Sequence, residues 1–125
     1  ICVYDGDDMA CVKKYGKYGN HPQYAALMGN EKYLSLFNEN GINVINNITS
    51  LAIDYYDIYK MLIEEKICSS LQIGVKDADG VYKWLICFDT FGDHKRKWSH
   101  DDIMSIYVLI KTIAKLDEIN DEKKL

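Results

Sequence analysis

The sequence predicts an α/β (α+β) fold in which a central antiparallel sheet of about six strands is flanked by helices on both faces. Residues 69–89 read as a hairpin: apolar and polar residues alternate over 71–76, a polar turn follows, and residues 82–88 are almost continuously apolar. A long amphipathic segment follows that hairpin and predicts the last helix. Because the hairpin joins consecutive strands, we expect the sheet to be largely antiparallel.

Composition limits the classes of function. The chain has 125 residues, of which 48% are hydrophobic and 27% charged, as in one soluble globular domain. A formal net charge of -4 without a clustered basic surface argues against nucleic-acid binding. No apolar run reaches the ~18–20 residues needed to span a bilayer, so we expect no membrane contact by this domain. The four cysteines form no metal-binding pair and fit small reduced hydrophobes in strands, so we expect a cytoplasmic protein. Residues 1–120 are predicted to form a single domain, with a frayed tail over 121–125 leading to a downstream domain and a first helix lying before Ile1.

Two strands and the polar turn between them are predicted at the start of the chain. Residues 1–4 and 10–15 form this pair around an acidic turn. Residues 24–37 are expected to form one or two short helices. Residues 42–48 alternate again and are interpreted as a strand, with Ile48 at its end.

Two further helices are indicated by their N-terminal signals. Asp54 is a plausible N-cap of a helix over 54–66. Ser99 caps the last helix, and the apolar residues before and after it, Trp98 and Ile103, fit a hydrophobic staple. This helix is expected to reach about residue 119. Its predicted sheet-facing stripe consists of Ile103, Ile106, Tyr107, Ile110, Ile113 and Ala114.

The residue patterns predict no catalytic residue, cofactor or metal. The acidic turns lack the glutamate that completes a calcium loop, and no phosphate-binding glycine loop is present. The sequence His100-Asp101-Asp102 falls in the first turn of a helix, where carboxylates favour the positive end of the dipole without any metal. No histidine lies beside a serine or cysteine in a nucleophile motif.

Three tyrosines crowd the helix predicted over 54–66. Tyr55, Tyr56 and Tyr59 have apolar rings and polar tips, which suit the wall of an amphipathic pocket. The alternative is a half-buried helix that places tyrosine at its rim.

Several weak motifs, taken in order, resemble the GAF family of sensory domains, in particular those of bacterial diguanylate cyclases. The similarity covers nearly the whole chain and depends on the order and spacing of motifs, none of which is catalytic. Gly74, Trp84 and Cys87 depart from the pattern, which usually has proline or small glycines there. The matching segments are Gly19-Asn20-His21-Pro22-Gln23, Gly41 to Leu51, Ile67-Cys68-Ser69-Ser70-Leu71, Phe88-Asp89, and Arg96 with Trp98 and the helix from Ser99.

The resemblance implies a non-enzymatic regulatory sensor covalently linked to an output domain such as a diguanylate cyclase (GGDEF) domain. It places an unknown small-ligand pocket on the sheet face opposite the last helix. A collapsed pocket filled by Trp84 would instead indicate a structural dimerisation module. A methionine-sulfoxide-reductase type of enzyme, using a cysteine thiol, is a third class. The predicted pocket residues are Tyr56, Tyr59, Ser70, Trp84 and Cys87.

The last helix also predicts self-association. Leu109 and Leu116 lie seven residues apart beside the sheet-facing stripe, the spacing of a helix–helix seam. We therefore expect a homodimer through helices, completed by an upstream helix. The alternative is a wide stripe buried within one subunit.

Overall fold

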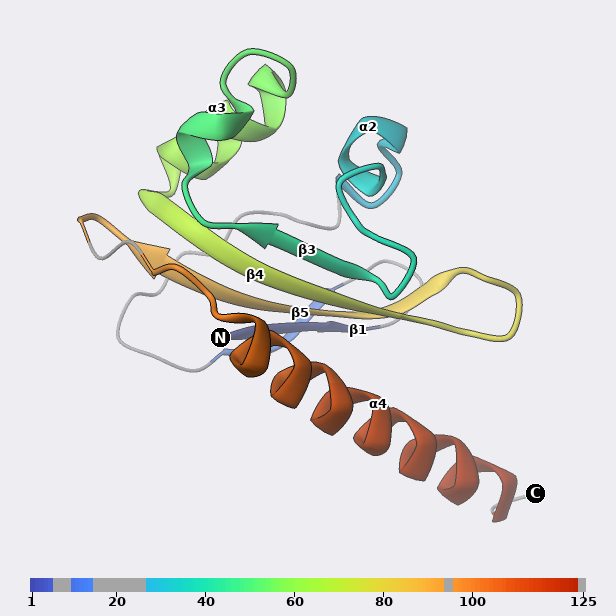
Figure 1. Ribbon diagram of the computed structural model, residues 1–125. Helices are drawn as coiled ribbons and strands as arrows, with labels where there is room; N and C mark the ends of the chain where they lie inside the picture. Colours follow the sequence, from blue (N-terminus) through green and yellow to red (C-terminus); the bar gives the residue numbers. More distant parts are fainter. Residues whose placement is uncertain (6–9, 15–26, 94–95, 124–125) are drawn as a thin grey trace.

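A computed structural model describes residues 1–5, 10–14, 27–93 and 96–123 (Figure 1). Its core is one antiparallel sheet of five strands in the order β2-β1-β5-β4-β3. The first hairpin therefore pairs with the second through β1 and β5, although about 80 residues separate them in the sequence. The strands are β1 (Cys2–Asp5), β2 (Ala10–Lys14), β3 (Ile42–Ile45), β4 (Ile67–Lys76) and β5 (Tyr82–Phe91).

The expected six-stranded sheet flanked by helices on both faces is wrong. The described residues contain five strands, and β5 continues past Asp89 to Phe91, pairing Thr90 with Ser69. The strand expected over 42–48 ends at Ile45. Asn47 ends it by capping a 3-10 turn, with its Oδ1 accepting the backbone N–H of Thr49 at 3.1 Å.

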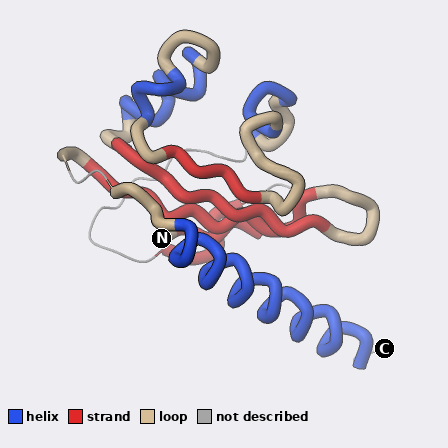
Figure 2. The backbone as a smooth tube through the Cα atoms, viewed as in Figure 1, coloured by secondary structure: helices blue, strands red, loops and turns tan. Residues whose placement is uncertain are grey.

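The helical layers are also smaller than expected. One sheet face carries only short segments, namely α2 (Glu31–Leu34), η1 (Ile48–Leu51) and α3 (Tyr56–Glu64). The single long helix, α4 (His100–Lys123), lies on the other side and runs diagonally across the direction of β4 and β5 (Figures 1 and 2). The molecule is therefore a small α+β domain with unequal helical cover.

The predicted hairpin of β4 and β5 is confirmed. Ile73 lies opposite Ile86, and the turn is closed by Asp77, whose Oδ1 accepts the backbone N–H groups of Asp79 (2.9 Å) and Val81 (3.1 Å). Gly80 supplies the positive φ that this turn requires. Strand alternation then divides the side chains between two cores, one on each face.

The first core lies between the sheet and the short helices, and the second lies between the sheet and α4. The first contains Tyr33, Phe37, Ile45, Ile48, Leu51, Ile58, Leu62, Ile67, Leu85 and Cys87. The second contains Ile42, Leu71, Ile73, Val75, Trp98 and Ile110.

Two expected helix boundaries differ from the structure. Asp54 is not an N-cap: α3 begins at Tyr56, and the capping position falls on Tyr55, whose side chain makes no capping bond. The backbone before α3 already forms a helical turn, since the Tyr55 N–H donates to the Leu51 carbonyl at 2.9 Å. Of the helix expected over 24–37, residues 24–26 lie outside the described part. The described portion contains α2, whose cap is Asn30.

Helix α4 begins where it was predicted to begin, but it ends later in the chain, and one residue of its expected sheet-facing stripe is exposed. The Asp102 N–H donates to Ser99 Oγ at 3.1 Å, which confirms the cap. The helix continues to Lys123 rather than ending near residue 119. Ile113, expected on the sheet-facing stripe, is 50% exposed, because its position on the helix turns it away from the sheet. No helix within the described residues is both long and apolar enough to cross a membrane.

Candidate functional site

A row of buried polar side chains crosses the first face of the sheet from β3 to β5. Gln72 is at its centre: its Oε1 accepts hydrogen bonds from the Tyr33 hydroxyl (2.5 Å) and from Asn43 Nδ2 (3.1 Å). Its Nε2 donates to Ser70 Oγ at 3.1 Å, and Ser70 Oγ donates to Asp89 Oδ1 at 2.6 Å. We call these five residues the buried polar row.

The row lies in the interior rather than at the rim. Tyr33, Ser70 and Gln72 are fully buried, Asn43 is buried, and only Asp89 is partly exposed. Burying hydroxyl and amide groups is costly unless each finds a partner, and here each of these side chains has one. A fully connected polar network inside an apolar core fixes the relative positions of the elements that it joins.

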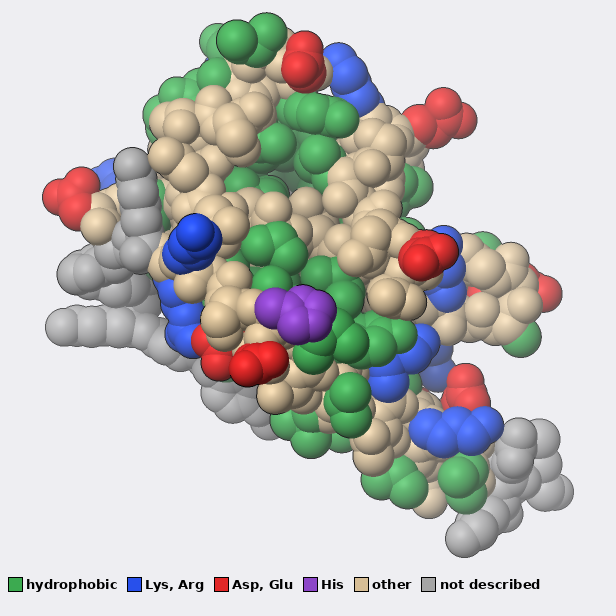
Figure 3. All heavy atoms as spheres, in the orientation of Figure 1, with side chains coloured by type: hydrophobic (Ala, Val, Ile, Leu, Met, Phe, Trp, Pro, Cys, Tyr) green, Lys and Arg blue, Asp and Glu red, His purple; other side chains and the backbone are tan. Residues whose placement is uncertain are grey.

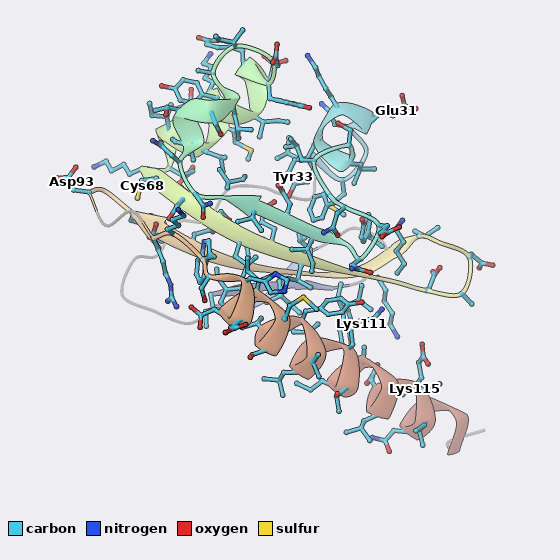
Figure 4. The ribbon with its side chains drawn as sticks, viewed as in Figure 1. Glu31, Tyr33, Cys68, Asp93, Lys111 and Lys115 are labelled. Carbon is cyan, nitrogen blue, oxygen red and sulfur yellow. The ribbon has the colours of Figure 1, made fainter. Side chains whose placement is uncertain are left out.

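Tyr33 is the member of the row that comes from a helix. Figure 4 shows its side chain reaching from α2 toward the sheet. Burial, and then the charges of Cys87, Asp89 and Tyr82, raise the pKa of Tyr33 well above its ordinary value. The phenol is therefore a neutral hydrogen-bond donor at neutral pH, which suits its contact with an amide oxygen.

The structure brings together three of the five predicted pocket residues. Ser70 belongs to the buried polar row, Cys87 is in the first core, and Tyr59 packs against that core. Trp84 lies on the other face, against the second core, so it does not fill a cavity on the first face. Successive residues of a strand point to opposite faces, and Trp84 differs from Cys87 by three positions.

Tyr56 lies at the rim rather than in a shared cavity. Its side chain is 58% exposed, with its ring 6.3 Å from that of Tyr59. With Asn30 and Lys32 it lines a recess of about 150 Å³, smaller than the ~300–1,000 Å³ of most ligand pockets. Figure 3 shows hydrophobic side chains at the base of the hollow between the α2 and α3 regions.

Four members of the row were not predicted from the sequence: Tyr33, Asn43, Gln72 and Asp89. One signal was present, because Ser70 and Gln72 occupy alternate positions in a mostly apolar strand whose residues 67–75 are all buried. Two polar side chains on one face of such a strand indicate a polar strip there. Their partners come from distant segments, so sequence spacing alone does not connect them.

The described residues contain no group of three His, Cys, Asp or Glu side chains that could hold a metal ion. Both cysteines whose side chains are described, Cys68 and Cys87, are buried. Cys68 Sγ lies 3.4 Å from the Thr90 carbonyl oxygen, to which it donates. A thiol held inside the protein in this way is poorly placed to attack a substrate.

The two residues of the predicted dimer seam are exposed. Leu109 is 59% exposed and Leu116 is 56% exposed. They belong to a larger set of exposed residues on the side of α4 that faces away from the sheet. This set, the α4 outer face, consists of Val108, Leu109, Thr112, Ile113, Leu116 and Ile119.

Comparison with protein-family models, with curated proteins and with solved structures gives no match to this chain. The resemblance drawn from the sequence motifs therefore stays a prediction. The two features that bear on function are the buried polar row and the α4 outer face.

Proposed function

We propose that this domain is a non-enzymatic regulatory module that pairs with a second copy of itself along helix α4. The observation that carries the proposal is the α4 outer face. A surface helix normally has one apolar stripe against the core and a polar face toward water. Helix α4 has apolar residues on both sides, and those opposite the sheet have no cover within the described residues.

The spacing on the outer face fits a helix–helix seam. Leu109, Thr112, Leu116 and Ile119 follow one another at intervals of three, four and three residues, the alternation of a coiled-coil a/d stripe. The Thr112 hydroxyl already donates to the Val108 carbonyl at 2.8 Å, so it needs no partner across a seam. The seam therefore presents mainly apolar groups.

Charged residues lie beside this seam rather than within it. Between Ser105 and Ile119 the a/d positions carry no charge, whereas Lys115 lies beside the stripe at a flanking g position. A second copy offers the same apolar stripe, and a two-fold axis brings each stripe against itself. The sheet contact uses the opposite side of α4, so pairing does not compete with folding.

Pairing gives the domain a way to control an attached output. If the resemblance to GAF domains holds, the domain belongs to a cytoplasmic signalling protein. Helix α4 then leads toward a covalently linked output domain such as a diguanylate cyclase. Joining two nucleotides into one product requires two such output domains side by side. A parallel α4 pair brings the two chains leaving the helices together, which supports this regulatory reading.

Sedimentation analysis over a range of protein concentrations tests the pairing. We expect a monomer–dimer equilibrium in the unmodified chain and a monomer for Leu109→Glu combined with Leu116→Glu. A control pair, Lys60→Ala with Lys111→Ala, lowers the net charge by the same two units and should leave the equilibrium unchanged. If the unmodified chain is a monomer throughout, or if both pairs of substitutions act alike, the proposed pairing is wrong.

Small-ligand sensing on the first face is a second candidate function. The buried polar row favours it, since Ser70 lies on the same face as Tyr59 and Cys87 and is linked to the partly exposed Asp89. Native mass spectrometry of the purified domain should then show a co-purified small molecule. A mass equal to that of the chain alone, with pairing intact, would favour a purely structural dimerisation module.

A further inference from the structure

A groove of about 400 Å³ separates the tip of the β4–β5 hairpin from the later turns of α4. Its volume falls within the ~300–1,000 Å³ of small-molecule sites. Val75, which is buried, and Trp84, which is half-buried, form the sheet side, and Ala114 lies on the helix side. This groove is on the opposite face of the sheet from the buried polar row, and no part of the proposed function uses it.

Helix α4 and the hairpin are linked at this groove by charged side chains. The only ion pair between them within the described residues joins Lys83 Nζ to Asp117 Oδ2 at 3.5 Å. Both side chains are about two-fifths exposed, at 41% and 42%. Exposed pairs of this kind contribute little to stability and exchange partners readily.

The position of Lys83 indicates which chemistry the groove can hold. Its ammonium lies 5.7 Å from the centre of the Trp84 ring while it contacts Asp117. An aromatic face beside a carboxylate is the arrangement that recognises organic ammonium groups. The side chain of Lys83 therefore occupies, from within the chain, the place that the ammonium of a ligand would take.

The remaining charges favour a cation as well. Asp77 and Glu118 add two more carboxylates to the groove, and Lys76 adds one further ammonium, so the lining carries three negative and two positive groups. Lys76 is engaged with the Tyr82 ring, 5.0 Å from its centre. Glu118 contacts Lys115 across 3.5 Å on the helix surface, a weak exposed pair.

We propose that this groove binds an aromatic amine, with the ring against Trp84 and the ammonium at Asp117 in exchange for Lys83. Tryptamine, which has both groups, serves as the probe. The readout is the chemical shift of the Trp84 indole N–H in nuclear magnetic resonance spectra of the full chain, with Trp98 as an internal reference. We expect saturable shifts at Trp84 with tryptamine and none with indole-3-propionate, which carries the opposite charge.

Three variants make the test specific. Asp117→Asn should weaken tryptamine binding about tenfold, which corresponds to ~1.4 kcal/mol, because the ammonium loses its counter-charge. Lys83→Gln should tighten binding about threefold, because it removes the competing ammonium. Asp101→Asn, an exposed change in the first turn of α4, should leave binding unchanged. The assignment is overturned if Trp84 shows no saturable shift, if the carboxylate probe binds equally well, or if Lys83→Gln weakens binding.

Discussion

The hydroxyl of Tyr33 donates a 2.5 Å hydrogen bond to Oε1 of Gln72, so the short helix α2 is tied to the centre of the sheet. Helix α2 is only four residues long and could not be stable alone. Its position depends on this hydrogen bond and on the packing of the Tyr33 ring against Phe37, whose ring centre is 5.3 Å away. Tyr33 therefore links the helical layer of the first face to the buried polar row.

Stability should fall steeply at alkaline pH because of Tyr33. Its pKa is raised in the folded state, chiefly by burial, whereas the unfolded chain has an ordinary tyrosine pKa of about 10. The stabilisation is therefore complete below pH ~10 and is lost as pH rises through the folded-state pKa. Replacing Tyr33 by Phe should reduce the alkaline slope of the unfolding free energy by up to ~1.4 kcal/mol per pH unit.

Urea unfolding of the two proteins between neutral and strongly alkaline pH measures this difference. At neutral pH we expect Tyr33→Phe to cost about 1–2 kcal/mol, because Gln72 Oε1 loses one of its two donors. The difference in unfolding free energy between the unmodified chain and Tyr33→Phe should then become smaller above pH ~10. Burial also raises the pKa of Tyr82, but this group is present in both proteins and cancels in the comparison. Parallel curves over the whole range would contradict the assignment.

Helix α4 allows a comparison between a cap and a core residue. Ser99→Ala removes the oxygen that accepts the Asp102 N–H and should cost about 1 kcal/mol. Ile110 is 6% exposed in the second core, so Ile110→Ala should cost about 2–5 kcal/mol by leaving a cavity. Thermal or denaturant unfolding of both variants gives the ranking. If Ser99→Ala proves the more damaging, α4 is not anchored through Ile110.

Local patterns predicted the parts of the fold that depend on neighbouring residues. The β4–β5 hairpin, the first strand pair and the Ser99 cap follow from turn residues, alternation and capping, which act within a few positions. The predicted number of strands and the predicted extent of the helical cover were wrong. The end of β3 before Asn47 and the extension of β5 to Phe91 beside Ser69 also differ from the prediction, because contacts between segments set where these strands end.

The candidate site was predicted only in part, for a similar reason. Ser70, Cys87 and Tyr59 were placed on the correct common face, but Trp84 was assigned to it as well. A single strand has two faces, and an almost continuous apolar run does not show which residues face which core. Asn43 and Gln72 meet through the pairing of β3 with β4, which the sequence spacing of 29 residues does not reveal.

Gly41 should tolerate no side chain. Its φ is +78°, and a Cβ built on it would lie 2.5 Å from the carbonyl oxygen of Gly74, at the point where the Gly74 N–H donates to the Gly41 carbonyl at 2.8 Å. A left-handed backbone alone costs an alanine about 1–2 kcal/mol, and the overlap with a backbone atom adds to this because β4 cannot move aside.

Gly29→Ala is the matched control, since no atom lies within 4 Å of its Cβ position. Restricting the unfolded chain should make that change neutral or slightly stabilising. Denaturant unfolding of both variants decides the matter: equal midpoints would mean that β3 and β4 do not approach each other as closely at Gly41 as the structure indicates.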